Sequence, residues 1–275
     1  MMYRRFLVVL ALSLVPVKVS AQHLILPVDY KLGLHPAEDK KIDGIDSETQ
    51  SQVPVTPGSQ SKTKQLNQIF KRLLSDEQTI WTSPTQVKRD QVKWIIPLAV
   101  ATGVMIATDY HSIKELGTPR EFAENSRDLS SIGSGFATFG AAGSIYLIGE
   151  LTHNQRATET GALGIEALIH ASIVANILKL ATTRERPNKV QGNGSFWDGG
   201  KSFPSGHSTV IWSLAAVIGE EYKAKPWVQI SAYGVAAVVA TARVTAQTHF
   251  PSDALVGSAL GYLIGHYIVK RHSKF

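Results

Sequence analysis

The stretch "KSFPSGHSTVIW", Lys201 to Trp212, places a Pro-Ser-Gly-His turn directly before an apolar run. A helix that begins at this turn offers unpaired backbone N–H groups and the positive end of its dipole. Ser205, Gly206 and His207 add a hydroxyl, an open backbone amide and an imidazole, which together suit an anion such as phosphate. The simpler alternative is an ordinary helix start, with Ser205 as the N-cap and His207 without a role. The rest of the chain decides between these interpretations.

Six apolar segments, one of which follows this turn, are joined by polar stretches. They show neither the alternation of a half-buried strand nor the regular turns of a β-sandwich, so the sequence predicts an all-α protein, a helical bundle of about six core helices. Several are rich in Gly and Ala, which lets helices pack at close range. The segments are Trp94–Thr108, Ile132–Gly149, Gly161–Leu180, Ser208–Gly219, Trp227–Ala242 and Leu255–Val269.

The N-terminal third has a different composition from the apolar segments. Residues 1–21 combine two arginines, an apolar run and a cleavage pattern of small residues, which is typical of a secretory signal peptide. The alternative is a short buried helix. Residues 22–62 are polar and rich in Pro, Ser, Gln and Asp, and we expect little fixed structure there. Residues 63–90 show apolar side chains at helical spacing and are predicted to form an amphipathic helical lead-in. The main domain is then 91–275.

The composition excludes several classes of protein. The chain has 275 residues and no cysteine, so zinc fingers, other thiolate metal sites and cysteine catalysis are excluded. Its net charge of +6 is modest, and the Lys and Arg residues are scattered; they do not form a basic stripe interleaved with aromatic residues. Nucleic acid is therefore not an expected partner, whereas an anionic ligand or membrane is compatible with this charge.

Three charged clusters lie where predicted helices end or begin. The first, "KLATTRERP", closes the third segment with Lys179 and Arg186, seven residues or two helical turns apart, before Pro187 stops the helix. The second is the turn that opens the fourth segment, and the third, "ARVTAQTHFPSD", joins the fifth segment to the sixth. Because successive helices of a bundle alternate in direction, we expect the three clusters to meet on one side.

The residue types in these clusters suit phosphoryl transfer. Lys179, Arg186 and Arg243 can neutralise a phosphate dianion, and the planar fork of arginine matches its oxygens. Of the two histidines, His207 and His249, one can attack phosphorus as a neutral imidazole while the other gives a proton to the leaving alcohol.

A carboxylate is needed to orient the attacking histidine. Pro251 is expected in the first turn of the sixth helix, so Asp253 should reach back toward His249 and fix its tautomer. Taken singly, these residues also have simpler interpretations: Lys179 as a helix-end cation, Arg186 as a surface charge and Asp253 as a capping group.

Taken together, K-x6-R-P, P-S-G-H and R-x5-H-x3-D, in this order, resemble the type 2 phosphatidic acid phosphatase (PAP2) superfamily, which also contains class A acid phosphatases and vanadium haloperoxidases. The resemblance implies a PAP2-like, membrane-associated helical domain. It also implies His249 as a nucleophile that forms a phosphohistidine, Asp253 as its partner and His207 as the general acid, with no metal and no cofactor. The implied phosphate-binding residues are Lys179, Arg186, Ser205, Gly206 and Arg243. One departure is Ala242, where the family usually has a serine.

The resemblance predicts a metal-independent phosphatase that hydrolyses phosphate monoesters or diphosphates, with lipids of the phosphatidate or polyprenyl diphosphate type as substrates and a membrane as partner. Three alternatives remain: a soluble periplasmic acid phosphatase acting on small esters, a vanadate-dependent haloperoxidase, and a catalytically silent envelope protein. Hydrolysis of p-nitrophenyl phosphate in excess EDTA discriminates a phosphatase from the last two alternatives.

The expected location is the bacterial inner membrane, with the site facing the periplasm; the alternative is a soluble periplasmic protein. If the signal peptide puts residue 22 outside and all six segments cross, the third segment ends in the cytoplasm. A full span needs about 20 apolar residues. A periplasmic site therefore requires that one segment does not cross, and Trp94–Thr108, which is short and contains Pro97, is the best candidate.

Overall fold

The computed structural model describes residues 57–86, 89–189 and 193–275, and in these ranges all regular structure is helical. The prediction of an all-α fold is therefore confirmed. The chain divides into two compact units, one ending at Gln78 and the other covering Thr79–Phe275. The predicted signal peptide, 1–21, and most of the predicted polar segment, 22–62, lie outside the described residues.

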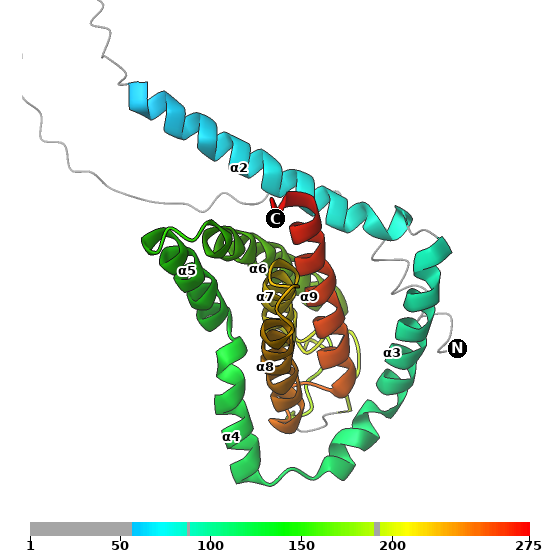
Figure 1. Ribbon diagram of the computed structural model, residues 1–275. Helices are drawn as coiled ribbons and strands as arrows, with labels where there is room; N and C mark the ends of the chain where they lie inside the picture. Colours follow the sequence, from blue (N-terminus) through cyan, green and yellow to red (C-terminus); the bar gives the residue numbers. More distant parts are fainter. Residues whose placement is uncertain (1–56, 87–88, 190–192) are drawn as a thin grey trace, which may run out of the picture. The chain divides into compact units, whose positions relative to one another are not determined.

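Eight α-helices make up the described part of the chain (Figure 1). The first, α2, begins inside the segment predicted to be polar and continues through most of the predicted lead-in. Five others contain predicted apolar segments in full, and α5 contains all but the first three residues of Ile132–Gly149. Only α4, whose sequence is too polar to form an apolar run, was not predicted. The helices are α2 (Pro57–Thr82), α3 (Arg89–Leu116), α4 (Arg120–Ser130), α5 (Gly135–Leu151), α6 (Gln155–Thr182), α7 (Gly206–Glu221), α8 (Pro226–Thr245) and α9 (Pro251–His272).

Helices α7 and α9 lie in backbone contact along a row of three glycines. Gly257, Gly261 and Gly265 are spaced four residues apart, so they lie on one face of α9. A Cβ atom at these positions would lie 2.6, 2.1 and 2.3 Å from carbonyl oxygens at the start of α7 and along it. No other residue type fits there without separating the helices. We call these three residues the glycine ridge.

The buried apolar core lies where α6, α7 and α9 meet. Leu168, Leu214, Val217 and Ile268 are among its members, and each is at most 4% exposed. The polar ends of α6, α7 and α9 are thereby held at fixed positions at one end of this core, which is where the three charged clusters of the sequence are found.

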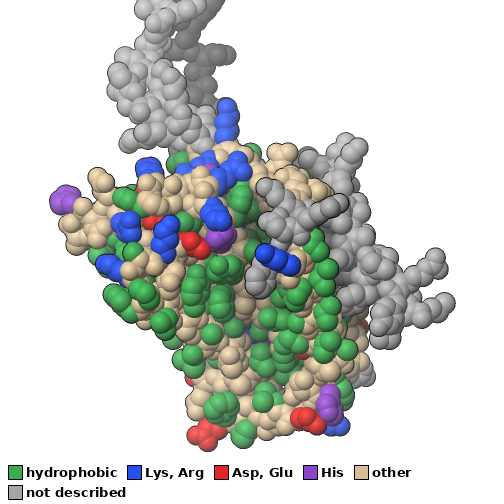
Figure 2. Space-filling view, turned by 45° about the vertical axis from the view of Figure 1, so that its right-hand side comes forward, with side chains coloured by type: hydrophobic (Ala, Val, Ile, Leu, Met, Phe, Trp, Pro, Cys, Tyr) green, Lys and Arg blue, Asp and Glu red, His purple; other side chains and the backbone are tan. Residues whose placement is uncertain are grey.

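Much of the outer surface of the helices is apolar. Three stretches are long and apolar enough to cross a membrane: Arg120–Leu151, Gln155–Thr182 and Pro226–Thr245. Large apolar side chains on them point outward; Leu151 is 81% exposed and Ile230 72%. Figure 2 shows hydrophobic side chains over much of the visible face. Such a surface suits lipid rather than water, in agreement with the predicted membrane association.

Candidate active site

The three charged clusters meet at one end of the bundle, as predicted from the sequence. Lys179, in the last turn of α6, donates from Nζ to the carbonyl of Lys201 at 3.2 Å and to that of Pro204, just before α7. The backbone N–H of Ser205 donates to the carbonyl of Asp253 at 2.9 Å, which joins the start of α7 to the first turn of α9.

Arg186 reaches this site from a loop rather than from a helix. The prediction that the helix continues to Pro187 is wrong, because α6 ends at Thr182 and Thr183 has a left-handed backbone with φ of 37°. The Thr182 hydroxyl ends the helix by donating both to its own last turn and to the carbonyl of Phe203 at 3.0 Å. Arg186 is half-buried in the loop that follows.

The turn before α7 has the geometry of a capped helix start. Ser205 is the N-cap, and its Oγ accepts from the Ser208 backbone N–H at 3.4 Å and from the Ser208 hydroxyl at 2.9 Å. Gly206 and His207 form the first turn, and the Cβ position of Gly206 lies 3.5 Å from the Lys179 side chain. The two interpretations of this turn are therefore compatible: Ser205 caps the helix, and the helix start faces a cation.

Arg243, in the last turn of α8, places a buried cation at the site. One of its terminal nitrogens, Nη1, donates to the Ser130 hydroxyl at 3.0 Å. Its Nε atom is buried and has no hydrogen-bond partner among the described residues. A buried N–H without an acceptor is costly, so this position is suited to an anion that supplies one. Ala242, which stands where a serine is usual in the resembled family, is 5% exposed.

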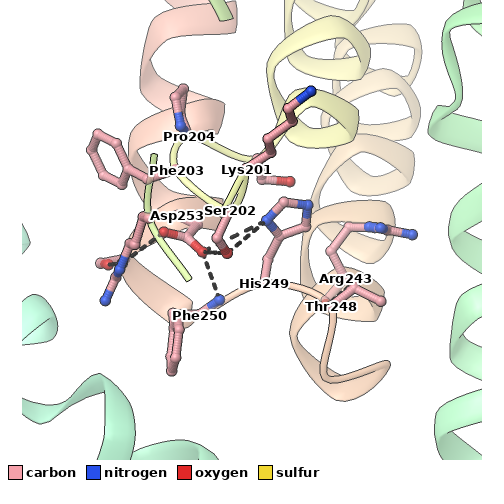
Figure 3. Close-up of polar contacts among 12 residues, drawn as sticks. Lys201, Ser202, Phe203, Pro204, Arg243, Thr248, His249, Phe250 and Asp253 are labelled. Carbon is pink, nitrogen blue, oxygen red and sulfur yellow. Dashed lines mark hydrogen bonds and ion pairs between the residues drawn. The ribbon is translucent and has the colours of Figure 1, made fainter. Parts of the chain in front are cut away.

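His249 lies between this cationic region and the carboxylate of Asp253 (Figure 3). Its backbone N–H donates to the carbonyl of Arg243 at 3.2 Å, and its Nδ1 lies 3.6 Å from Oδ2 of Asp253. The Ser202 hydroxyl donates to the same carboxylate oxygen at 2.5 Å and lies 3.5 Å from His249 Nδ1. The predicted pairing of Asp253 with His249 is thus present as a close contact, and Ser202, which the sequence did not single out, belongs to it.

Both histidines favour the neutral form when no anion is bound. Burial lowers the pKa of His207 to about 4, and the nearby charges of Arg243, His249, Lys179 and Arg186 add to this effect. Burial also lowers the pKa of His249 to about 4, although Asp253 opposes it. A neutral His249 is a competent nucleophile, whereas His207 needs an anion beside it before it can hold a proton.

Asp253 is held in its ionised form by a dense set of donors. Burial opposes ionisation, but the hydrogen bond from His249, the charge of Arg184 and the hydroxyl of Ser202 outweigh it and lower the pKa of Asp253. The Phe250 backbone N–H donates to Oδ2 of Asp253 at 2.9 Å, the oxygen that also accepts from the Ser202 hydroxyl. The other oxygen accepts from Arg184 at 2.6 Å.

No pattern in the sequence pointed to the network behind Asp253, which joins Arg184 to Asp109 on α3. Arg184 is 1% exposed, and its Nη2 lies 2.7 Å from Oδ2 of Asp109. The one available signal was a charged residue, Asp109, placed directly after an apolar run; its partner, 75 residues further on, could not be read from spacing.

A cavity of about 120 Å³ lies beside Lys179 and His207. It is bounded by the start of α5, one face of α6 and the first turns of α7. Its remaining lining residues are Gly135, Ser172, Ala175, Asn176, Gly206 and Val210. Because His207 borders both the cations and this cavity, a group bound in the cavity would lie next to the imidazole.

The chain is similar over part of its length to bacterial proteins named lipid A 1-phosphatase. It is 31% identical over 93 residues to a lipid A 1-phosphatase of Porphyromonas gingivalis, in an alignment that covers 34% of this chain and 19% of that protein. It is 31% identical over 108 residues to a lipid A 1-phosphatase of Rhizobium etli, covering 37% of this chain and 45% of that protein. The matches thus span less than half the length of these relatives.

Two solved structures are similar in fold. The transmembrane PAP2 type phosphatidylglycerolphosphate phosphatase of Bacillus subtilis aligns with a TM-score of 0.49 and 22% identity, over 66% of this chain and 98% of that one. Aquifex aeolicus LpxE aligns with a TM-score of 0.44 and 18% identity, over 59% of this chain and 94% of that one. Residues 161–275, which include every predicted site residue, match the model of the PAP2 superfamily. Over this region, the chain is similar to the PAP2 superfamily.

Proposed function

We propose that the protein is a phosphatase that removes phosphate from a phosphorylated lipid through a phosphohistidine intermediate, without a metal ion. The observation that carries the proposal is the arrangement around His249. The charges of Lys179 and Arg243 act on its neutral imidazole from one side, and the ionised Asp253 lies at the Nδ1 edge. This is the distribution of charge that attack on a phosphate dianion requires.

The chemistry follows from the two edges of the His249 ring. Because Nδ1 faces Asp253, Nε2 is the nitrogen left to attack phosphorus. The Nε2–P bond forms as the bond between phosphorus and the ester oxygen breaks, and protonated His207 donates its proton to that oxygen. Water then attacks phosphorus while His207 accepts its proton; the Nε2–P bond breaks, which frees His249, and phosphate leaves. Lys179, Arg186, Arg243, the Ser205 hydroxyl and the Gly206 amide bind the phosphate oxygens in both steps.

The substrate class is inferred from the surroundings of the site. The cavity beside His207 lies between α5 and α6, and both belong to stretches long and apolar enough to cross a membrane. The alcohol released in the first step can therefore approach from lipid. The relatives named lipid A 1-phosphatase support a phosphorylated lipid, and phosphorylated glycolipids join phosphatidate and polyprenyl diphosphate as candidates.

The test is phosphate release by the purified full-length protein from these three lipids and from small soluble esters, all in excess EDTA. We expect release from at least one lipid at a higher kcat/KM than from any soluble ester, and its loss in His249→Ala. Release that requires an added divalent metal, or that persists in His249→Ala, would contradict the proposed mechanism. A preference for soluble esters would favour the acid phosphatase alternative.

We also propose that the site faces the periplasm. Asp198 is exposed in the loop on the side of the site, and Lys223 is exposed beyond the opposite end of α7. The chain has no cysteine, so single cysteines can be placed at both positions and treated with a membrane-impermeant maleimide. In intact spheroplasts we expect Asp198→Cys to react and Lys223→Cys to react only after lysis. The reverse pattern would place the site in the cytoplasm, and reaction of both would indicate a periplasmic protein.

A further inference from the structure

We propose that Asp109 and Arg184 are positioning residues for the reaction: they hold the Asp253 carboxylate in place and set the negative charge that it presents to His249. The inference rests on the proposed function, in which His249 is the nucleophile. It assigns a role to two buried charged residues that contact neither the phosphate-binding cations nor the cavity.

Arg184 is fixed on all sides. Its Nε donates to the Gly194 carbonyl at 3.0 Å, and Nη1 donates to Asp253 Oδ1 at 2.6 Å and to the Ser252 hydroxyl at 2.7 Å. The rings of Phe196 and Phe250 lie over the guanidinium, with centroids 4.7 and 4.4 Å from its central carbon. A planar cation stacked on aromatic rings and bonded along its edges has one available orientation.

Asp109 completes this arrangement from another helix. Its Oδ1 accepts from the Ser252 backbone N–H at 3.1 Å, and its Oδ2 accepts from the Ser252 hydroxyl and from Arg184. Asp109 therefore ties α3 both to Arg184 and to the first turn of α9, one residue before Asp253. Both Asp109 and Arg184 are 1% exposed, so water does not screen their charges.

The charges in this network do not cancel. One guanidinium lies between two carboxylates. Burial raises the pKa of Asp109, and Arg184 and Ser252 oppose this shift. When both carboxylates are ionised, Arg184 shares its charge between Asp109 and Asp253, and the group carries an excess negative charge facing His249. That excess stabilises the imidazole when it becomes cationic. Without Asp109, Arg184 would neutralise Asp253 more completely; without Arg184, Asp253 would present its full charge. The two substitutions should therefore act on His249 in opposite directions.

The other groups that face His249 remain the same in these variants. Ser202 and Asp253 lie at the Nδ1 edge, and the cations Lys179 and Arg243 act on the ring from the phosphate side. His207 also interacts electrostatically with His249 across the site. A difference between the Asp109 and Arg184 variants therefore reports on the buried network rather than on the phosphate-binding residues.

The experiment is the pH dependence of kcat for p-nitrophenyl phosphate at saturation, which reports ionisations in the enzyme–substrate complex. We expect Arg184→Gln to move the acidic limb of the profile to higher pH and Asp109→Asn to move it to lower pH, each by about half a pH unit or more. The matched controls are Arg156→Gln, which removes a cation, and Glu221→Gln, which removes a buried acid. Both residues lie at the ends of α6 and α7 that are far from the site, where Arg156 donates to the Glu221 carbonyl at 3.0 Å. Both controls should leave the limb unmoved.

The outcomes separate a positioning role from a purely structural one. Active variants whose acidic limbs stay in place, or move in the same direction, would overturn the inference. If Arg184→Gln does not fold, the Asp109→Asn and Arg184→Lys variants test the inference. Arg184→Lys keeps the positive charge but loses the planar guanidinium, so kcat should fall while the acidic limb of the profile stays in place. Asp109→Asn with an unmoved or raised limb would again overturn the inference.

Failure of the proposed function would look different. A wild-type protein that hydrolyses no phosphate ester, or a His249→Ala variant as active as wild type, would refute the assignment of the nucleophile. Hydrolysis that depends on His249, combined with limbs that do not shift, would refute only the role of Asp109 and Arg184.

Discussion

Sulfate, which remains a tetrahedral dianion at neutral and mildly acidic pH, should inhibit this protein more strongly as the pH falls. His207 has a pKa of about 4 when no anion is bound, so at pH 7 about one molecule in a thousand carries the proton there. A bound dianion offsets the cations that disfavour the imidazolium and accepts its N–H. Binding is then coupled to uptake of a proton at His207, and the coupling is reciprocal.

The size of the effect follows from this pKa. If the bound anion brings His207 to half-protonation at pH 7, its pKa rises from about 4 to about 7, which corresponds to about 4 kcal/mol of coupling. Between pH 7 and pH 5, which both lie above the free pKa, the sulfate Ki should fall about fivefold over the first unit and about eightfold over the second, or about fiftyfold in all. His207→Gln should remove this dependence.

The assay is competitive inhibition of p-nitrophenyl phosphate hydrolysis at pH 5, 6 and 7, at constant ionic strength because sulfate itself screens charges. The good leaving group leaves enough activity in His207→Gln for the Ki to be measured. A sulfate Ki that does not change with pH in the wild type, or a slope that survives in His207→Gln, would refute the assignment of the proton to His207.

Three further predictions concern the metal, the acid and the helix contact. Activity should persist in excess EDTA and be inhibited by vanadate, which mimics phosphate in transfer; loss on chelation would indicate a metal enzyme. His207→Ala should slow the hydrolysis of an alkyl phosphate far more than that of p-nitrophenyl phosphate, because only the alkoxide needs a proton to leave; equal losses would contradict its role as the acid. Gly261→Ala, whose Cβ would lie 2.1 Å from the Thr209 carbonyl oxygen, should cost about 1–3 kcal/mol in detergent-solubilised thermal unfolding, whereas Gly143→Ala, with no neighbour within 4 Å, should be neutral or stabilising.

Sequence periodicity was sufficient to predict the helical core and the meeting of the three clusters. Apolar runs mark the helices that are buried or face lipid, so all six predicted segments correspond to observed helices. Helix α4 was missed because its sequence, "REFAENSRDLS", has no apolar run. The end of α6 was misplaced because a tertiary contact, the Thr182 hydroxyl with Phe203, ends the helix before the proline does.

The site residues that the sequence did not predict were missed for the same reason, because they depend on tertiary contacts. The convergence of Lys179, His207, His249 and Asp253 could be predicted because their spacing and their place at helix ends carry information. The pairing of Arg184 with Asp109 depends on how α3 packs, and nothing in the local sequence distinguishes Arg184 from a surface charge. From its sequence neighbours, Thr183 and Glu185, the Arg184 side chain would ordinarily be expected to point into solvent.

The glycine ridge has a consequence for motion in the site. Backbone contact along α7 and α9 allows little sliding or tilting of one helix against the other, because the carbonyls of one lie where side chains of the other would otherwise be. His207 begins one of these helices, and His249 shortly precedes the other. The two histidines therefore move together as one rigid body. Fluctuations that open the site are left to the other two helix ends, which carry Lys179 and Arg243. In the proposed reaction, opening would then weaken the binding of phosphate while the distance between the two histidines stays constant.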